Sequence, residues 1–112
     1  MNLIIAIVRP SAVEAIKNAL AELNLPGFTV SEVHGHGRQK GHTEVYRGAE
    51  YTVDLLPKAE IKVAVPASQT DKVIEAISSA ARSGKIGAGK IFVTTLSQAV
   101  RIRTGERGPD AL

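Results

Sequence analysis

A glycine-rich stretch in the last third of the chain has the residue types that bind phosphate. Residues 84–91 read Gly-Lys-Ile-Gly-Ala-Gly-Lys-Ile and match the G-x-x-x-x-G-K spacing of a P-loop. Two features argue against a P-loop. Ile91 stands where the magnesium-binding Ser or Thr belongs, and the stretch runs from an expected helix into an expected strand, the reverse order. The glycines and two lysines still suit an anion cradle, because backbone amides can approach a charge closely there. Taken alone, the stretch is better interpreted as an ordinary turn.

Further polar residues could complete a site for a phosphate or a carboxylate. Arg101 and Arg103 alternate in Val100–Arg103, which is expected to be a short strand. Both guanidinium groups would then point to one face, as in a phosphate clamp. Lys58 stands where it could pair with a carboxylate ligand, and Gln39 carries a neutral oxygen suited to magnesium. Each of these residues, taken alone, is also typical of a solvated surface.

The chain offers little for catalysis or for a protein-bound metal. Its histidines are His34, His36 and His42, but it has no cysteine and no obvious carboxylate to complete a ligand set. They are therefore interpreted as polar loop residues. We find no Ser-His-Asp arrangement with recognisable spacing and no reactive cysteine. The sequence predicts a binding protein and not an enzyme.

Six regular elements are expected to hold these residues. Hydrophobic periodicity predicts the order β-α-β-β-α-β, with strands at Leu3–Val8, Phe28–Val33, Glu60–Val65 and Ile91–Leu96. The helices follow Pro10 and Pro66, and their apolar stripes are Val13, Ile16, Leu20 and Leu23, and Val73, Ile77 and Ala80. The expected N-terminal capping boxes are Ser11–Glu14 and Ser68–Asp71, and Gly84 is expected to end the second helix.

This order predicts an α+β fold, the ferredoxin-like βαββαβ sandwich, in which an antiparallel sheet carries both helices on one face. Residues 1–112 suit one domain. The first and fourth strands are apolar on both sides, so the second face of the sheet should be covered too. The chain has no spare helix for that purpose, and homo-oligomerisation is the economical explanation.

The longest polar segment, His34–Leu56, interrupts the regular alternation. It contains four glycines, charges of both signs and both tyrosines of the chain, and it is expected to close at Pro57. Connections of this length are generally functional or disordered, and this composition cannot bury enough apolar surface to fix its own shape. We expect an arm that a ligand or a partner protein orders.

Composition excludes several classes of protein. The net charge of +3, with cations in three separated segments, suits a small phosphate ligand better than a polyanion. The absence of cysteine excludes disulfides and thiolate metal sites. The apolar run Leu3–Val8 is too short for a signal-peptide core or a membrane span, so a soluble cytoplasmic protein is the default expectation.

Four motifs in order resemble those of the PII nitrogen-regulatory signal proteins, and the resemblance covers nearly the whole chain. Tyr46–Tyr51 (YRGAEY) is similar to the signature of the family's mobile T-loop, and Gly84–Val93 (GKIGAGKIFV) to that of its B-loop. Gly37–Glu44 and Val100–Glu106 are similar to two further stretches. The resemblance implies a single PII-like domain with a T-loop at about 36–55, a B-loop at about 82–90 and a C-terminal segment at about 100–112.

The resemblance also implies a homotrimer, in which ATP and ADP compete for clefts between subunits. The nucleotide would meet Gly87, Gly89 and Lys90 of the B-loop, Arg101 and Arg103 of the neighbouring subunit, and Thr29, Gly37 and Arg38. With Mg-ATP bound, 2-oxoglutarate would coordinate the Mg²⁺ beside Gln39 and pair with Lys58. The T-loop would respond by a shift in its conformational populations.

Regulation of target proteins through the T-loop is a further implication of the resemblance. The targets would include an ammonium transporter or glutamine synthetase adenylyltransferase. The chain itself would bind no nucleic acid and would not span a membrane, but it could be recruited reversibly to a membrane channel. Tyr51 stands at the position that is uridylylated in many bacterial relatives. Three positions depart from the family's usual residues: Lys62 stands in place of an acidic residue, Ala88 in place of a frequent Asp, and His36 in place of a frequent Phe. ATP binding is expected to persist despite these changes.

Three alternatives stand beside this interpretation. An RNA-binding module of the same topology would stack bases on sheet aromatics, but the central strands offer Phe92 and little else. A nucleotide hydrolase or kinase would need a positioned nucleophile or base, and the sequence offers none that is convincing. Slow incidental ATP hydrolysis is compatible with a regulator. A PII-like regulator could sense another metabolite such as bicarbonate, whereas Gln39 and Lys58 favour 2-oxoglutarate.

Overall fold

The computed structural model describes residues 1–25, 27–36, 43–46, 49–52, 55–82 and 88–112. Its helices and longer strands are β1 (Asn2–Val8), α1 (Val13–Glu22), β2 (Thr29–Gly35), β5 (Leu56–Val65), α2 (Thr70–Ala81) and β6 (Gly89–Thr95). These six elements follow the predicted βαββαβ order. Two short strands, β3 (Thr43–Tyr46) and β4 (Ala49–Thr52), pair with each other between β2 and β5.

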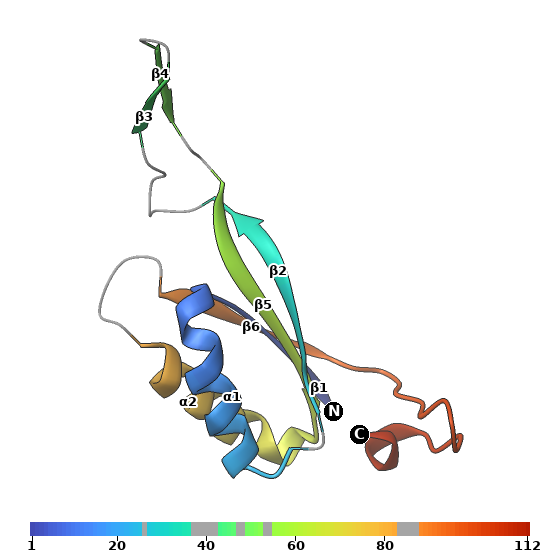
Figure 1. The fold of residues 1–112 in the computed structure, drawn as a ribbon. Helices are drawn as coiled ribbons and strands as arrows, with labels where there is room; N and C mark the ends of the chain where they lie inside the picture. The colour runs from blue at the N-terminus through green and yellow to red at the C-terminus, as the bar shows by residue number, and fades with distance from the viewer. Residues whose placement is uncertain (26, 37–42, 47–48, 53–54, 83–87) are drawn as a thin grey trace.

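The four longer strands form one antiparallel sheet in the order β2-β5-β1-β6. Both helices lie on the same face of this sheet, and the β3–β4 hairpin extends beyond the end at which β2 and β5 part (Figure 1). The α+β arrangement predicted from the sequence is therefore confirmed. The hairpin corrects one expectation, because the polar segment His34–Leu56 contains paired strands of its own and begins and ends inside β2 and β5.

The core lies between the sheet and the two helices. Alternate residues of β1 and β5 point toward the helices, because side chains alternate between the two faces of a strand. The buried set is Ile4, Ala6 and Val8 on β1, Ala59, Ile61, Val63 and Val65 on β5, Ile16 and Leu20 on α1, and Val73 and Ile77 on α2. Both predicted helical stripes and the alternation in β5 are thus confirmed. Burial of each large aliphatic side chain contributes roughly 1.5–3 kcal/mol.

The other face of the sheet, here called the open face, carries apolar residues that the described chain leaves partly exposed. The pairing register places Leu3, Ile5 and Ile7 of β1 on this face, with Ala64 of β5 and Phe92 of β6. Phe92 is 54% exposed. The prediction that a second copy covers this face therefore stays a prediction, but the apolar surface that motivated it is present.

Two predicted helix starts are wrong. Each helix is preceded by a short 3-10 turn, at Pro10–Ala12 and at Ala67–Gln69, so its N-cap is Ala12 or Gln69, and neither makes a side-chain capping bond. Ser11 and Ser68 fall inside these turns and not at the caps. Fixed φ at proline favours such a tight turn, which shifts each helix start by one residue from the expected cap. The expected terminator, Gly84, lies outside the described residues.

Two predicted strand boundaries also need correction. Pro57 does not close the arm, because β5 already begins at Leu56 and Pro57 pairs with His34. The β1–β5 pairing reaches only the Val8–Ala59 pair, so Pro57 has a paired strand on one side only, the kind of position in which a sheet tolerates proline. Val100–Arg103 is not a strand: Val100 makes an isolated bridge to Arg107, and residues 102–104 form a turn.

Candidate functional site

The glycine-rich stretch enters β6 at a point where only glycine fits. Gly89 has φ +126°, and a Cβ there would lie 2.1 Å from the main-chain oxygen of Ile7. Side chains rarely adopt that backbone conformation, and the contact atom is backbone that cannot rotate away. Gly89 therefore lets β6 begin directly against β1. The following residue, Lys90, pairs with Ile7 and lies exposed on the open face.

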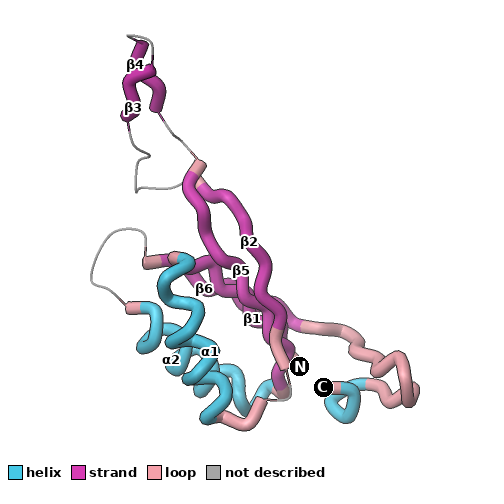
Figure 2. Tube along the Cα trace, viewed as in Figure 1, coloured by secondary structure: helices cyan, strands magenta, loops and turns pink. Residues whose placement is uncertain are grey.

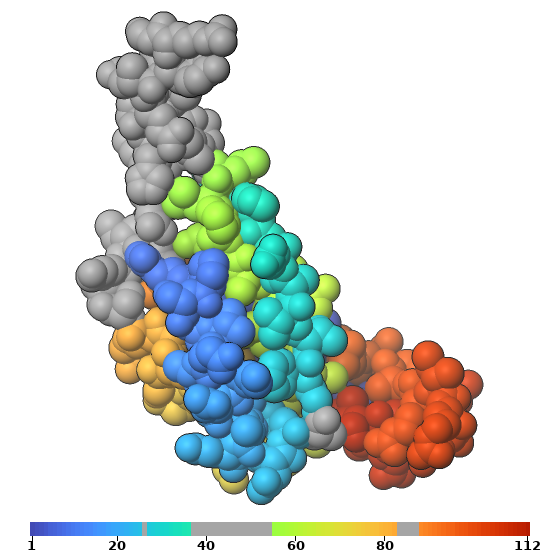
Figure 3. Space-filling model, in the orientation of Figure 1, coloured from blue at the N-terminus to red at the C-terminus, as the bar shows by residue number. Residues whose placement is uncertain are grey.

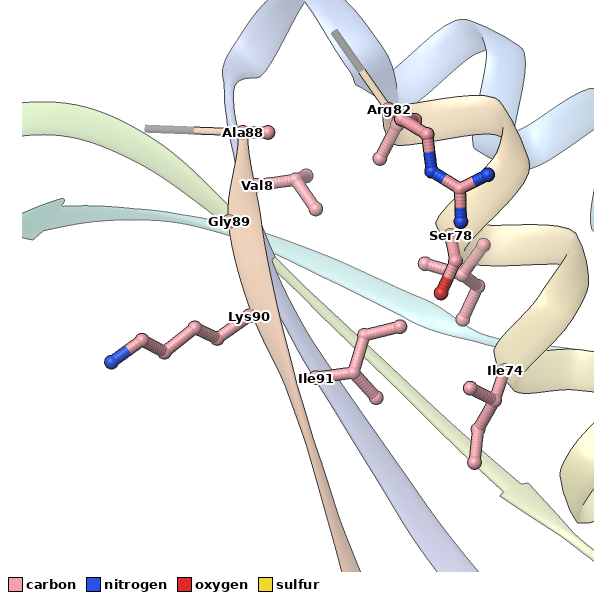
Figure 4. Close-up of a pocket in the computed structure, with 10 residues that line it drawn as sticks. Val8, Ile74, Ser78, Arg82, Ala88, Gly89, Lys90 and Ile91 are labelled. Atoms are coloured by element: carbon pink, nitrogen blue, oxygen red, sulfur yellow. The ribbon is translucent and has the colours of Figure 1, made fainter. Parts of the chain in front are cut away.

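A pocket of about 330 Å³ lies on the opposite side of β6, between that strand and α2. Figure 4 shows Val8, Ile74 and Ile91 pointing into it, with Ser78 and Arg82 at the α2 side. The side chain of Lys90 points away from this pocket (Figure 4). The pocket is thus an apolar recess on the helix-covered face of the sheet. Lys90, the predicted anion contact, lies on the opposite, open face.

Lys58 lies at the end of the open face from which the arm leaves. It pairs with Val33 across β2 and β5, and a Cβ on Gly35 would lie 3.3 Å from Lys58 Cγ. The aliphatic part of Lys58 therefore passes over Gly35. Lys58 therefore lies at the base of the arm, and its pairing with a carboxylate ligand stays a prediction.

A second charged pair lies further along β5 on the same face. Lys62 Nζ is 3.5 Å from Glu60 Oε1, and Glu60 shares its row of the sheet with Ser31, Ile7 and Lys90. The open face thus carries Lys58, Lys62 and Lys90 against Glu60 alone on the described parts of β5 and β6. Lysine excess of this kind favours an anionic ligand.

Thr29 and Lys90 are not brought together in one protomer. Thr29 begins β2 and pairs with Lys62, and β2 and β6 are the two edges of the sheet. Three strand spacings of about 4.8 Å separate those edges by roughly 14 Å. The residues expected to line one nucleotide site therefore lie on opposite edges of the same sheet.

Arg101 and Arg103 lie still further from Lys90. They belong to a C-terminal hook, residues 99–112, which extends from the sheet as a separate lobe (Figures 1 and 3). Lys90 lies at the start of β6 and the hook follows its end, and a seven-residue strand spans roughly 20 Å. The prediction that the two arginines share one face of a strand is wrong, because Arg101 precedes the turn at 102–104 and Arg103 lies within it. Figure 2 shows this stretch as loop.

The hook is closed by its own hydrogen bonds. The Arg101 amide donates to the Glu106 oxygen at 2.9 Å, the Gly105 amide donates to the Arg101 oxygen at 2.8 Å, and the Gly108 amide donates to the Ala99 oxygen at 2.9 Å. Gly105 has φ +80°, which lets the chain reverse there. Ile102, at the outer bend, is 99% exposed.

Several predicted residues lie outside the described chain. These are Gly37, Arg38, Gln39, His42 and Gly87. The backbone of Tyr51 is described, and it pairs with Glu44 in the β3–β4 hairpin. Of the three departures from the family pattern, Lys62 forms the ion pair with Glu60, Ala88 lines the apolar pocket, and His36 is exposed just beyond β2.

The described ranges contain no group of three or more His, Cys, Asp or Glu side chains that could hold a metal. None of their helices has the length and hydropathy needed to cross a membrane. The cationic groups that the described residues offer to an anion are the lysines of the open face and the arginines of the hook.

Sequence reasoning missed Glu106, which forms an ion pair with Arg101, and Thr104, which contacts Glu106. Glu106 Oε1 lies 3.8 Å from Arg101 Nη1. The Thr104 hydroxyl donates a hydrogen bond to the other carboxylate oxygen, Glu106 Oε2. The order Arg-x-x-Thr-Gly-Glu carried a usable signal, because a glycine between two polar residues often reverses the chain and brings flanking side chains together.

Comparison with known proteins gives consistent matches over the whole chain. Residues 1–106 match the family profile "Nitrogen regulatory protein P-II". The chain is 54% identical over 112 residues to a "Nitrogen regulatory protein P-II" of Rhodospirillum rubrum and 54% identical to one of Azospirillum brasilense. It is 52% identical to "Nitrogen regulatory protein GlnK" of Escherichia coli K12. Each match covers 100% of both chains.

Proposed function

This chain belongs to the nitrogen regulatory protein P-II family, and on that premise we propose that it binds ATP or ADP in the clefts between the subunits of a homotrimer. The family consists of non-enzymatic signalling proteins of nitrogen regulation, whose effectors in general are ATP and 2-oxoglutarate. One observation carries the proposal for this chain: Lys90 and the two hook arginines, which are all assigned to the phosphates, lie near opposite ends of β6 and beyond, too far apart in one protomer to meet the same phosphate group. A neighbouring copy is needed to bring them together.

The open face supports assembly with other copies. Leu3, Ile5, Ile7, Ala64 and Phe92 form an apolar strip across its central strands, with Lys62 and Lys90 beside it. An exposed strip of this kind is stabilised by burial against an equivalent surface. Three copies related by a rotation close a ring, in which one edge of each sheet faces the other edge of the next. That arrangement places Thr29 of one copy near Lys90 of another.

In this proposal residues 1–112 form one domain with a T-loop at about 36–55, a B-loop at about 82–90 and a C-terminal segment at about 100–112. The phosphates contact Lys90 and the backbone at Gly87 and Gly89, with Arg101 and Arg103 supplied by the neighbouring copy. Thr29, Gly37 and Arg38 line the same cleft. The glycine conformation at Gly89 and the orientation of Lys90 support these roles.

The proposed 2-oxoglutarate site lies at the base of the arm. Lys58 pairs with one carboxylate of the ligand, and Gln39 holds the Mg²⁺ of Mg-ATP beside it. Lys58 fits this role, because it lies over Gly35 on the same face as Lys90. When bound, Mg²⁺ screens the charges of the phosphates and offers coordination positions to a dicarboxylate. The nucleotide therefore completes the second site, and the two ligands should strengthen each other's binding reciprocally.

The output of this proposed sensor is the conformation of the arm. Each ligand shifts the arm's populations by its differential affinity for the arm's conformers. The arm then binds or releases targets such as an ammonium transporter or glutamine synthetase adenylyltransferase in the cytoplasm. Tyr51, in the β3–β4 hairpin, is the proposed uridylylation site, and a nucleotide there would add charge and bulk to the docking surface.

Calorimetry of 2-oxoglutarate with and without Mg-ATP tests the proposal. We expect measurable heat only when Mg-ATP is present, and a marked loss of that heat in Lys58→Gln. Lys72→Gln, an exposed lysine of α2, is the matched control and should bind as the unaltered protein does. Binding of 2-oxoglutarate without nucleotide, or the absence of any ATP or ADP binding, would contradict the proposal. Light scattering should give the mass of three chains.

A further inference from the structure

The guanidinium group of Arg101 is held from two sides within the hook. Arg101 Nη2 donates a hydrogen bond to the main-chain oxygen of Leu112 at 3.1 Å, and Arg101 Nη1 lies 3.8 Å from Glu106 Oε1. The other oxygen of the same carboxylate, Glu106 Oε2, accepts a hydrogen bond from the Thr104 hydroxyl. Thr104 therefore fixes Glu106, and Glu106 and Leu112 together fix the direction of the arginine.

The backbone places the same two residues opposite each other. Arg101 and Glu106 are joined by the hydrogen bond from the Arg101 amide, and the bridge between Val100 and Arg107 continues this pairing. Gly105 closes the turn between them with a positive φ. The ion pair thus joins two residues whose backbones are already paired within a closed, hydrogen-bonded turn.

The ion pair between Arg101 and Glu106 adds little to the folding stability of the protein. The Arg101 and Glu106 side chains are 42% and 39% exposed, and ion pairs this accessible to water contribute little to folding. An arginine has five N–H donors in a planar fork, so two contacts leave donors available for a phosphate. Arg103 makes no hydrogen bond or ion pair with any described residue, so the two arginines differ in how far they are ordered before a ligand arrives.

We propose that Glu106, fixed by Thr104, is a positioning residue that orients Arg101 toward the phosphates of a nucleotide bound by the neighbouring copy. This inference rests on the proposed function, which gives Arg101 its ligand. Pre-ordering a long side chain removes an entropy cost that binding would otherwise incur, a cost equivalent to about 2- to 12-fold in Kd. Glu106 contributes through Arg101 and makes no contact with the nucleotide.

The test is calorimetric titration of ADP and of ATP into the assembled protein and its Glu106→Gln variant. We expect Glu106→Gln to weaken both nucleotides about five-fold, and Thr104→Val to weaken them less, because the carboxylate remains. The direction is diagnostic, since removal of a negative charge near a phosphate would by Coulomb's law alone strengthen binding. Glu14→Gln is the matched control, because Glu14 pairs with Lys17 on the surface at a similar 3.9 Å.

A second set of variants separates positioning from a general structural role. In an Arg101→Gln background, Glu106→Gln should produce no additional loss of affinity, whereas in an Arg103→Gln background the five-fold loss should persist. The mass of the assembly and the thermal midpoint of Glu106→Gln should match those of Glu14→Gln. Unchanged or tighter nucleotide binding by Glu106→Gln would overturn this inference alone. Failure of the unaltered protein to bind either nucleotide would overturn the proposed function and this inference together.

Discussion

Replacement of Gly89 by alanine tests how β6 begins against β1. The new Cβ would lie 2.1 Å from the Ile7 oxygen and 3.1 Å from the Ile7 carbon and the Val8 Cα, all backbone atoms. No side-chain rotation can relieve these contacts, so either β6 or β1 must move. The φ of +126° at Gly89 adds a conformational cost, because L-residues with a Cβ rarely adopt it.

Two other glycines separate the conformational part of this cost from the steric part. At Gly27 an added Cβ would have nothing within 4 Å, and its φ is not positive, so Gly27→Ala should change the free energy of unfolding by less than about 1 kcal/mol. Gly105 has equally open space but φ +80°, so Gly105→Ala should lower the free energy of unfolding by about 1–2 kcal/mol. Gly89→Ala combines strain of about 1–3 kcal/mol with an overlap of about 1–3 kcal/mol, and we expect about 4 kcal/mol.

Urea denaturation of the three variants at one protomer concentration measures these differences. A fixed concentration is needed, because association contributes to apparent stability. With a slope of about 2 kcal/mol per molar, the midpoint for Gly89→Ala should fall by roughly 2 M urea. A loss for Gly89→Ala no larger than that for Gly105→Ala would refute the reasoning, since it would mean that the Ile7 oxygen does not lie where β6 begins.

The remaining predictions concern the core and the open face. Leu20 is fully buried, so Leu20→Ala should lower the free energy of unfolding by about 2–5 kcal/mol, measured by urea denaturation. Leu55→Ala is its control, and at 57% exposure that substitution should change stability by less than about 0.5 kcal/mol. Phe92→Glu should place a charge in the proposed subunit contact and reduce the assembly to single chains by light scattering, with the circular dichroism of the fold retained. A variant that keeps the mass of three chains would contradict the assembly proposed for the open face.

Local pattern was sufficient for most of the fold. The spacing of Ile16 and Leu20, and of Val73 and Ile77, identified the buried faces of both helices, and alternation in β5 identified its buried residues. These predictions succeeded because the period of an element follows from its own backbone geometry. The predicted caps failed for a related reason: a short 3-10 turn precedes each helix, and residue types alone do not distinguish it from a first helical turn.

The candidate site was predictable in its residue types and less so in its arrangement. Lys58 and Lys90 lie on one face of the sheet, as two adjacent anionic ligands would require. The alternation around Arg101 suggested a strand, but Gly105 reverses the chain after the turn, so Glu106 returns to meet Arg101. A contact of that kind depends on one backbone dihedral angle, which the spacing of charged residues does not report.

Residue order therefore determined the family, the βαββαβ order, the faces that are buried and the charged residues available for a phosphate. The tertiary structure decided where those residues lie: Thr29 and Lys90 on opposite edges of one sheet, Arg101 and Arg103 on a hook beyond its far end. The physical reason is that periodicity is a property of a few consecutive residues. The separation of two edges is set by strand pairing across the whole chain.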